Sequence, residues 1–549
     1  MMSMDLWLFW QSTHALFAVE ALLIVASLAF TCRLAGPERT LRRLARHRLA
    51  PVAAGAFALL LRAVVLPVEP VPSPSMHDEF SYLLAADTFA HGRVTNPTHP
   101  MWEHFETYHE DQTPTYASMY PPLQGLVLGL GQAVTGIAFA GVWLSVGVMC
   151  AALCWALRGW LPPGWALLGG AIAAIRLAAF SYWGNSYWGG ALAATGGALV
   201  FGALPRLVRS SRPRDAMLAA LGIGMLANTR PYEGLVFSVA VGLVALWHVR
   251  KLRLRTILPP ACAVLAVTAA LMAYYDWRAF GSPTTLPYTI NRNTYAVAPF
   301  FLFQSPRPEP VYRHRDMREF YTGWELTTFE SARSRIGFIL NSIDKLYTAW
   351  SFWIGPVLTL PLLASLWTWR SRRTRIFLFL AASVAASSAI VPFFMPHYIA
   401  PATVVIYALI LQGMRGLSRQ WPRVVRAVPL ISIAMAVFQV TLDAAAVPRD
   451  TSWPMTWARN WPTPLGRETI AAEVRAQGGP QLVIVQYGEG HNAGTEYVYN
   501  DADIDASPIV WARDMGADKN AELLRYFAAR KAWLLVVTSE PVLSPYPHP

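Results

Sequence analysis

The sequence is poor in charged residues and in cysteine. Only 14% of its 549 residues are Asp, Glu, Lys or Arg, whereas a soluble globular domain carries about 25%. The hydrophobic content of 54% excludes an intrinsically disordered chain. The four cysteines, Cys32, Cys150, Cys154 and Cys262, lie in or beside apolar runs, so no disulfide framework is expected. The composition therefore excludes a soluble enzyme and a disulfide scaffold, and it predicts a polytopic membrane protein.

What the sequence has instead is a series of long apolar runs. A run of about 20 apolar residues is long enough to cross a bilayer as a helix, and we interpret the pattern as about twelve such helices. The first apolar run, 6–31, lacks a basic n-region and a small-residue cleavage site. We therefore interpret it as a membrane span and not as a signal peptide.

The positive charges indicate how the chain is oriented. The net charge is +12, and every second connection between apolar runs is rich in arginine, with Glu38 and Asp215 as the only acids in these connections. The positive-inside rule places these connections in the cytoplasm. The long segments 69–120, 276–346 and 447–549 then lie outside. The excess of positive charge is a topology signal, and no basic stripe on a soluble domain indicates nucleic-acid binding.

These features divide the chain into three regions. Residues 1–48 form an extra N-terminal transmembrane helix with a basic cytoplasmic loop, and residues 49–446 form an all-α membrane domain with external loops 69–120 and 276–346. In residues 447–549, runs such as Gln481–Gln486 are typical of buried strands, and an amphipathic helix is expected at 518–530. We therefore predict a small external α/β domain. It lacks a Gly-rich phosphate loop, so it carries no sign of a nucleotide site.

The strongest local feature is the pair Asp78-Glu79, which opens a predicted helix just after an outward-going span. Acidic side chains are favoured in the first turn of any helix because of its dipole, so the pair alone is compatible with a plain helix start. Further on, Tyr120-Pro121-Pro122-Leu123 opens an apolar stretch that is too short to span. We expect that stretch to form a helix in the membrane interface.

The order and sidedness of these elements resemble the GT-C superfamily of membrane glycosyltransferases, which use polyprenyl-phosphate sugars. Similar families are the protein O-mannosyltransferases, the aminoarabinose-to-lipid-A transferases and the rhizobial lipopolysaccharide-core transferases. Asp78 matches their catalytic acid, Glu79 its usual neighbour and Pro121-Pro122-Leu123 their Pro-Pro-Leu element. The stretch 394–401 resembles their late basic-x-Tyr-x-x-Pro element. The resemblance covers about residues 50–445.

The chain departs from the family pattern at two places. Residues 180–189 contain no acid where these families often have a second one, and His397 stands where a Lys or Arg is frequent. The missing acid argues against a scheme with two carboxylates or a bridging metal.

The resemblance implies a transferase that moves a sugar from a polyprenyl-phosphate donor to a lipid, glycan or protein acceptor. The reaction would be an inverting single displacement. It needs a general base near the acceptor hydroxyl, which the resemblance assigns to Asp78. Because the leaving group is a phosphate, the site also needs cations and hydrogen-bond donors. The candidates for the donor phosphate are Arg176, Arg230, His397 and Tyr398, and the candidates for contacts with the substrates are Tyr120, Tyr182, Trp183, Asn185 and Glu233.

Structural roles compete with these assignments. Arg230 is close enough in sequence to Glu233 for an ion pair, Arg176 could reach the interface by snorkelling, and His397 could be a plain interfacial histidine. A divalent metal is compatible with the chemistry but is not expected. His104 and His109 are its candidate ligands, although their spacing matches no metal signature.

Two other functions share much of this pattern, namely a sugar-polymer ligase of similar architecture and a lipid or solute transporter. A transporter should show inverted repeats, and we find no repeat in the sequence. We expect the protein to lie in a bacterial inner membrane, with its active site facing the periplasm and with membrane lipid as a partner.

Overall fold

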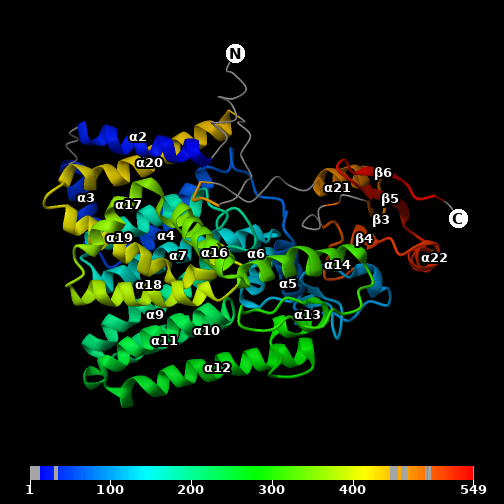
Figure 1. The fold of residues 1–549 in the computed structure, drawn as a ribbon, viewed down its shortest axis with the longest axis horizontal. Helices are drawn as coiled ribbons and strands as arrows, with labels where there is room; N and C mark the ends of the chain where they lie inside the picture. The colour runs from blue at the N-terminus through cyan, green and yellow to red at the C-terminus, as the bar shows by residue number, and fades with distance from the viewer. Residues whose placement is uncertain are drawn as a thin grey trace. The chain divides into compact units, whose positions relative to one another are not determined.

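The structure is a computed structural model that describes residues 13–29, 35–445, 455–458, 466–488, 491 and 496–547. The chain folds into two compact units, each built from three separate stretches of sequence (Figure 1). The first unit consists of Met1–Pro72, Val142–Ala269 and Phe338–Pro462. The second consists of Ser73–Gly141, Ala270–Gly337 and Thr463–Pro549.

The first unit is helical, and helix α2 packs along α20 within it (Figure 1). The helices that lie in this unit or mainly in it are α2 (Thr13–Ala29), α3 (Ala35–Arg46), α4 (Ala50–Val64), α7 (Phe139–Trp160), α8 (Pro163–Ala173), η2 (Ala174–Ala179), α9 (Ala191–Ser210), α10 (Pro213–Ala227), α11 (Pro231–Trp247), η3 (Val249–Lys251), α12 (Leu254–Phe280), α16 (Arg335–Ala349), η5 (Trp350–Ile354), α17 (Gly355–Leu366), α18 (Arg372–Ala389), η6 (Pro396–Ala402), α19 (Thr403–Leu417) and α20 (Pro422–Ala444).

Small residues let these helices approach one another closely. A Cβ atom at Gly413 would lie 1.8 Å from the backbone oxygen of Pro361, and one at Gly197 would lie 2.1 Å from that of Pro401. Membrane helices pack through such small residues because lipid provides no hydrophobic drive toward association. The prediction of an all-α membrane domain is confirmed.

The predicted count of about twelve spans is not confirmed. Within the described residues, six helices are long and apolar enough to cross a membrane, or seven if the bent pair α3–α4 counts as one span. Several other predicted spans are shorter helices, such as α11 with 17 residues. Proline stands at the start of α8 and α11, where it is compatible with the first helical turn but ends the preceding one. The apolar runs of the sequence already separate at both prolines.

The second unit combines helices, a hairpin and a sheet. Its elements are α5 (His77–Ala90), η1 (Trp102–Phe105), β1 (Glu110–Asp111), β2 (Ala117–Ser118), α6 (Leu123–Thr135), α13 (Pro287–Tyr295), α14 (Arg315–Arg318), η4 (Glu319–Glu325), α15 (Leu326–Arg333), α21 (Arg467–Ala476), β3 (Gln481–Tyr487), β4 (Ile509–Arg513), α22 (Ala517–Tyr526), β5 (Lys531–Val537) and β6 (Val542–Pro545). Helix α6 is the predicted short helix after Pro121-Pro122, and it packs against α5.

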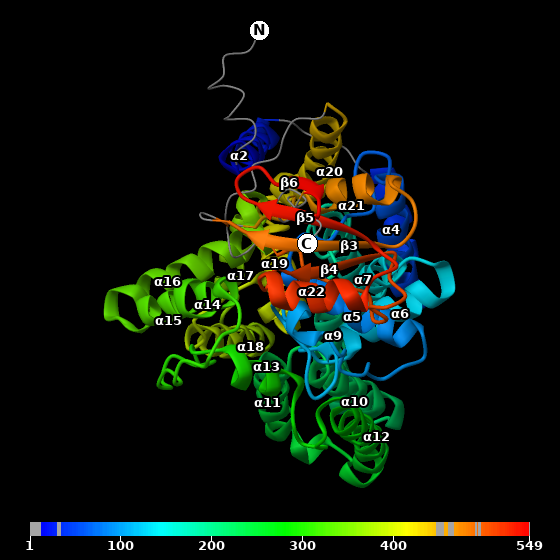
Figure 2. The same cartoon turned by 90° about the vertical axis from the view of Figure 1, so that its right-hand side faces the viewer.

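The C-terminal sheet has the strand order β4-β3-β5-β6 (Figure 2). Strands β4, β3 and β5 are parallel, and β6 pairs antiparallel with β5. The alternating side chains of β3 face two different cores: Leu482 packs with Leu523 of α22, and Val483 packs with Val474 of α21. The predicted small α/β fold is thereby confirmed, with β6 as a strand that the sequence pattern did not reveal.

The α22 face of this sheet shares its core with segment 69–120. Leu84 of α5, Phe105 of η1 and Tyr116 are buried in the same cluster as Leu482 and Leu523. The segment that contains Asp78 and the C-terminal strands therefore form one folded unit.

Candidate active site

Asp78 and Glu79 both lie in the first turn of α5, but they make different contacts. Glu79 is buried, and its Oε2 accepts hydrogen bonds from the backbone N–H groups of Ser75 and Met76, at 2.8 and 3.1 Å. These are backbone donors at the helix start that have no partner inside the helix. Glu79 thus caps α5, whereas Asp78 makes no such contact with the backbone of the described residues.

The carboxylate of Asp78 is held by side chains from two later segments of the same loop. Oδ1 of Asp78 lies 2.6 Å from Nδ1 of His109 and also accepts a hydrogen bond from the hydroxyl of Tyr120. That hydroxyl lies 2.9 Å from Nδ1 of His109. An ionised carboxylate only accepts hydrogen bonds, so Nδ1 of His109 is the donor. Nε2 of His77 stands 4.0 Å from Oδ1.

These contacts determine the protonation of the site. Burial raises the pKa of Asp78, but the charges of His109 and His77 and the hydrogen bonds from His109 and Tyr120 outweigh it and hold that pKa below its usual range. Burial, together with the charge of His109, lowers the pKa of His77 to about 3. At neutral pH the site therefore contains the ionised carboxylate of Asp78 beside the uncharged imidazole of His77.

A small hairpin places His109 beside Asp78. Strand β1 follows directly after His109 and pairs with β2, and the φ angle of His109 is +61°, in the left-handed region. The carbonyl oxygen of His109 accepts hydrogen bonds from Oγ of Ser81 at 2.6 Å and from the backbone N–H of Met119 at 3.1 Å. Ser81 and Ser118 are joined by a further hydrogen bond of 2.7 Å. The backbone on both sides of the hairpin is thus tied to α5.

Aromatic rings surround the carboxylate. Tyr82 stacks on Tyr120 with a centroid distance of 4.5 Å, and Tyr288 of α13 lies edge-on to Tyr120 at 5.8 Å. Phe320 lies 5.4 Å from His77. Tyr82, Tyr120 and Phe320 are buried, so these rings pack around Tyr120 and His77, the neighbours of Asp78.

One group of side chains in the described residues has the types and spacing to hold a metal ion. The ligand atoms of His77, Asp78 and His109 all lie within 4.8 Å of one another. Two imidazoles and one carboxylate form a donor set that suits zinc and other transition metals. His109 was a metal candidate from the sequence, but its partner there, His104, instead has Nδ1 3.0 Å from the carbonyl oxygen of Arg513.

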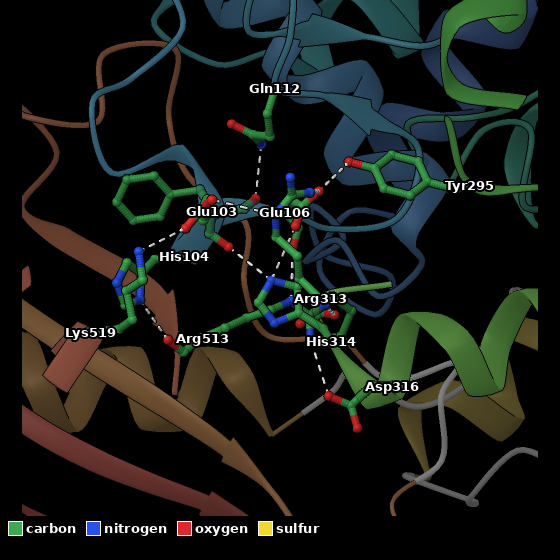
Figure 3. A network of polar contacts seen from close by, with 12 residues as sticks. Glu103, His104, Glu106, Gln112, Tyr295, Arg313, His314, Asp316, Arg513 and Lys519 are labelled. Atoms are coloured by element: carbon green, nitrogen blue, oxygen red, sulfur yellow. Dashed lines mark hydrogen bonds and ion pairs between the residues drawn. The ribbon is translucent and has the colours of Figure 1, made fainter. Parts of the chain in front are cut away.

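A second polar network ties the segment before His109 to the rest of the unit (Figure 3). The buried carboxylate of Glu106 accepts hydrogen bonds from Tyr295 at 2.9 Å and from Arg313 at 3.2 Å, and it lies 3.3 Å from His314. Arg513 donates to the backbone oxygen of Glu106 at 2.6 Å. Burial raises the pKa of Glu106, but hydrogen bonding and the charge of His314 outweigh it and lower that pKa overall.

The first unit contains a separate polar cluster. Tyr182 and His397 are buried, with the Tyr182 hydroxyl 2.9 Å from Nδ1 of His397 and accepting a hydrogen bond from its backbone N–H at 3.0 Å. The guanidinium of Arg230 lies 4.5 Å from the ring centre of Tyr398. The sequence predicted these four residues, Tyr182, Arg230, His397 and Tyr398, from distant positions. His397 and Tyr398 lie in η6, and Arg230 directly precedes the neighbouring helix α11.

The other predicted residues of this unit have internal contacts. Arg176 forms a fully buried ion pair with Glu20 at 3.3 Å. Asn185 donates to the backbone oxygens of Ala179 and Ser181, each at 3.0 Å. Trp183 is buried, and so is Glu233, in the first turn of α11.

Sequence reasoning did not single out His77 or Glu20. His77 directly precedes Asp78, and a histidine in that position gives no signal of its own. Glu20 is an acid inside an apolar run, which is costly in a membrane and marks a partner inside the protein. That signal was present in the sequence, but its partner Arg176 lies 156 positions away.

The fold of this chain is similar to that of a solved crystal structure. A crystal structure of ArnT from Cupriavidus metallidurans bound to undecaprenyl phosphate matches 88% of this chain and 92% of its own, with a TM-score of 0.51 and 13% sequence identity. A structure of an oligosaccharyltransferase from Archaeoglobus fulgidus, in complex with zinc and sulfate, matches 89% of this chain and 67% of its own, with a TM-score of 0.48 and 12% identity. No protein-family model and no curated protein sequence matches the chain.

The match to ArnT shows that this chain shares the fold of that protein. The particular reaction is not a property of the fold, and it has to be argued from the site.

Proposed function

We propose that the protein is a membrane glycosyltransferase that moves a sugar from a polyprenyl-phosphate donor to the hydroxyl of an acceptor. The observation that carries the proposal is the carboxylate of Asp78, which is ionised and held between His109 and Tyr120. The resemblance in fold to ArnT, a protein crystallised with undecaprenyl phosphate, supports the choice of donor class.

In this reaction the acceptor oxygen attacks the anomeric carbon of the sugar. Asp78 takes the hydroxyl proton as general base, while the bond from the anomeric carbon to the phosphate oxygen breaks and its electron pair leaves with the polyprenyl phosphate. A single displacement of this kind inverts the anomeric configuration. Because a phosphate is a stable leaving group, no general acid is required, in contrast to glycoside hydrolysis.

The donor phosphate needs cations and hydrogen-bond donors. We assign this role to Arg230, with Tyr398 and His397 beside it, because the guanidinium of Arg230 is stacked on Tyr398 and is partly exposed. Arg176 is a poorer choice for this role, because its charge is already balanced by Glu20. Tyr182 supports His397.

The acceptor is a lipid, a glycan or a protein, and the site that contains Asp78 is proposed to face the periplasm of a bacterial inner membrane. The experiment that tests the function uses protein purified in detergent and a panel of radiolabelled undecaprenyl-phosphate sugars. The proposal expects release of undecaprenyl phosphate together with labelled acceptor from at least one member of the panel. Transfer from nucleotide sugars alone would contradict it.

A further inference from the structure

We propose that His109 is a positioning residue, which holds one oxygen of Asp78 so that the other oxygen is left to take the acceptor proton. This inference rests on the proposed function. It concerns a residue whose contacts come from a hairpin that the sequence pattern did not predict.

The first observation is the unequal use of the two carboxylate oxygens. Both hydrogen bonds to the Asp78 carboxylate, from His109 and from Tyr120, go to Oδ1. Within the described residues no hydrogen bond reaches Oδ2. Oδ2 is not one of the buried polar atoms that lack a partner, so Oδ2 is accessible to solvent. The side chain of Asp78 is 15% exposed to solvent. Oδ1 is thus occupied by the protein, and Oδ2 is the oxygen that a substrate hydroxyl can reach.

The second observation is the backbone of His109. Its φ angle of +61° is uncommon for a residue other than glycine, and such conformations persist only where the surroundings fix them. Here the carbonyl oxygen of His109 is held by Ser81 and by the N–H of Met119. The imidazole is therefore in place before any substrate binds, as a preorganised site requires.

The third observation is the packing of the ring. His77 lies edge-on to His109 with a centroid distance of 4.4 Å, and Phe320 lies at 6.1 Å. These neighbours restrict rotation of the imidazole, so Nδ1 stays directed at Oδ1 of Asp78.

The proton balance of the step follows from this geometry. The acceptor O–H proton moves to Oδ2 of Asp78 while the acceptor oxygen bonds to the anomeric carbon and the phosphate leaves with its electron pair. His109 keeps its Nδ1 proton throughout and forms no bond to the substrate. In the opposite arrangement, Asp78 orients the ring and Nε2 of His109 is the base, as in a catalytic triad. The substitutions below distinguish the two arrangements.

Two substitutions of His109 distinguish the contribution of its Nδ1–H donor from that of Nε2 and of the backbone, and a third substitution, at His91, is the control. His109→Asn retains an N–H donor close to the position of Nδ1 and tolerates a positive φ, but it has no counterpart of Nε2. His109→Gly retains the backbone conformation and removes the donor. His91→Asn is the matched control, because His91 lies 3.3 Å from the carboxylate of Asp87 on the same loop but is 61% exposed.

We expect kcat of His109→Asn to stay within about threefold of the wild type. In His109→Gly we expect kcat to fall by roughly 30-fold or more, with KM for donor and acceptor changed by less than about threefold, and added imidazole to restore part of the rate. His91→Asn should behave as the wild type. A His109→Asn variant as inactive as His109→Gly would overturn the proposal in favour of His109 as the base. A kcat of His109→Gly within threefold of the wild type would overturn it as well.

A spectroscopic measurement tests the same contact without any substrate. We expect a far-downfield imidazole N–H proton resonance in the wild type and in His91→Asn, and its loss in both His109→Gly and Asp78→Asn. Absence of that resonance in the wild type would contradict the inference. If the wild type transfers no sugar, the proposed function fails, yet the resonance still decides whether His109 donates to Asp78.

Discussion

Arg513, at the end of strand β4, donates a hydrogen bond of 2.6 Å to the backbone oxygen of Glu106. Strand β4 belongs to the C-terminal sheet, whereas Glu106 belongs to segment 69–120 and stands three residues before His109. Arg513 also forms ion pairs with Asp316 and Glu496, and its side chain is buried. A single guanidinium thus joins three distant parts of the sequence within the second unit (Figure 3).

We predict that Arg513→Met destabilises the second unit strongly. Removal of one partner leaves the carboxylates of Asp316 and Glu496 without their cation, and breaking a buried ion pair costs about 3–5 kcal/mol. Thermal unfolding of the purified protein measures the effect, and limited proteolysis of segment 69–120 locates it. Lys519→Ala is the control, because the ion pair of Lys519 with Glu103 is exposed and such pairs contribute about 0–1 kcal/mol. Equal losses in the two variants would disprove the role of Arg513.

The N-terminal helix α2 should be required for the stability of the first unit. Glu20 of α2 accepts a hydrogen bond from Trp457 at 2.9 Å besides its ion pair with Arg176. Glu20→Leu leaves the buried cation of Arg176 uncompensated, with an expected cost of about 3–5 kcal/mol. The double variant Glu20→Leu, Arg176→Leu should recover most of that loss, because two apolar side chains can replace a buried pair.

The control for α2 is Glu38→Leu, since the ion pair of Glu38 with Arg426 lies at the surface. We expect that substitution to change the unfolding temperature little. If the Glu20→Leu variant unfolds at the temperature of the wild type, α2 contributes nothing through this pair.

Asp111 should make the protein less stable as the pH rises. Burial raises its pKa to about 8, although a hydrogen bond from Asn291 opposes this shift. Below pH 4 the carboxyl is neutral in both states, so it has no effect on stability. Between about pH 4 and pH 8 it ionises in the unfolded chain but not in the folded one, so the folded state binds more protons and the free energy of unfolding falls with rising pH.

The test for Asp111 is the unfolding temperature of the wild type and of Asp111→Asn at a series of pH values. The amide cannot ionise, so the variant should lose the part of the pH dependence between about pH 4 and pH 8 and should be more stable than the wild type at pH 8. Parallel curves for the two proteins would show that Asp111 is ionised in the folded state.

Arg230 should contribute to the affinity for the donor. A hydrogen bond to a charged group contributes about 1.5–3 kcal/mol, which corresponds to a loss of roughly 10-fold to 100-fold in affinity for Arg230→Gln. Binding of undecaprenyl phosphate to the purified variants provides the measurement. Arg255→Gln changes an exposed arginine and should bind as the wild type does. Unchanged affinity in Arg230→Gln would remove this residue from the phosphate site.

Local patterns made much of the fold predictable. Alternating and continuous apolar runs revealed the strands at Gln481 and Ala532, and the short run after Pro122 revealed α6. The predicted count of about twelve spans is not confirmed, because several apolar helices in the described residues, such as Pro163–Ala179, have fewer than 18 residues. Apolar composition predicts a buried helix without fixing whether that helix is long enough to cross a membrane.

The site was predictable only in part, for a physical reason. Asp78 stands in a local motif, so the resemblance identified it as a candidate. His77 and the role of His109 depend on a hairpin, a positive φ angle and a hydrogen bond across 31 positions, none of which leaves a periodic trace in the sequence. Likewise the ion pair of Glu20 with Arg176 depends on the packing of two helices.

The central claim is that Asp78 is the general base of sugar transfer from a lipid phosphate. It is tested most directly by the rate at which Asp78→Asn transfers radiolabelled sugar from an undecaprenyl-phosphate donor that the wild type uses. The control is Asp518→Asn, the same chemical change at an exposed residue in the first turn of helix α22. We predict a loss of about 100-fold or more, as expected when a general base is removed, with donor binding retained and with Asp518→Asn fully active. A rate for Asp78→Asn within a few-fold of the wild type would contradict the account.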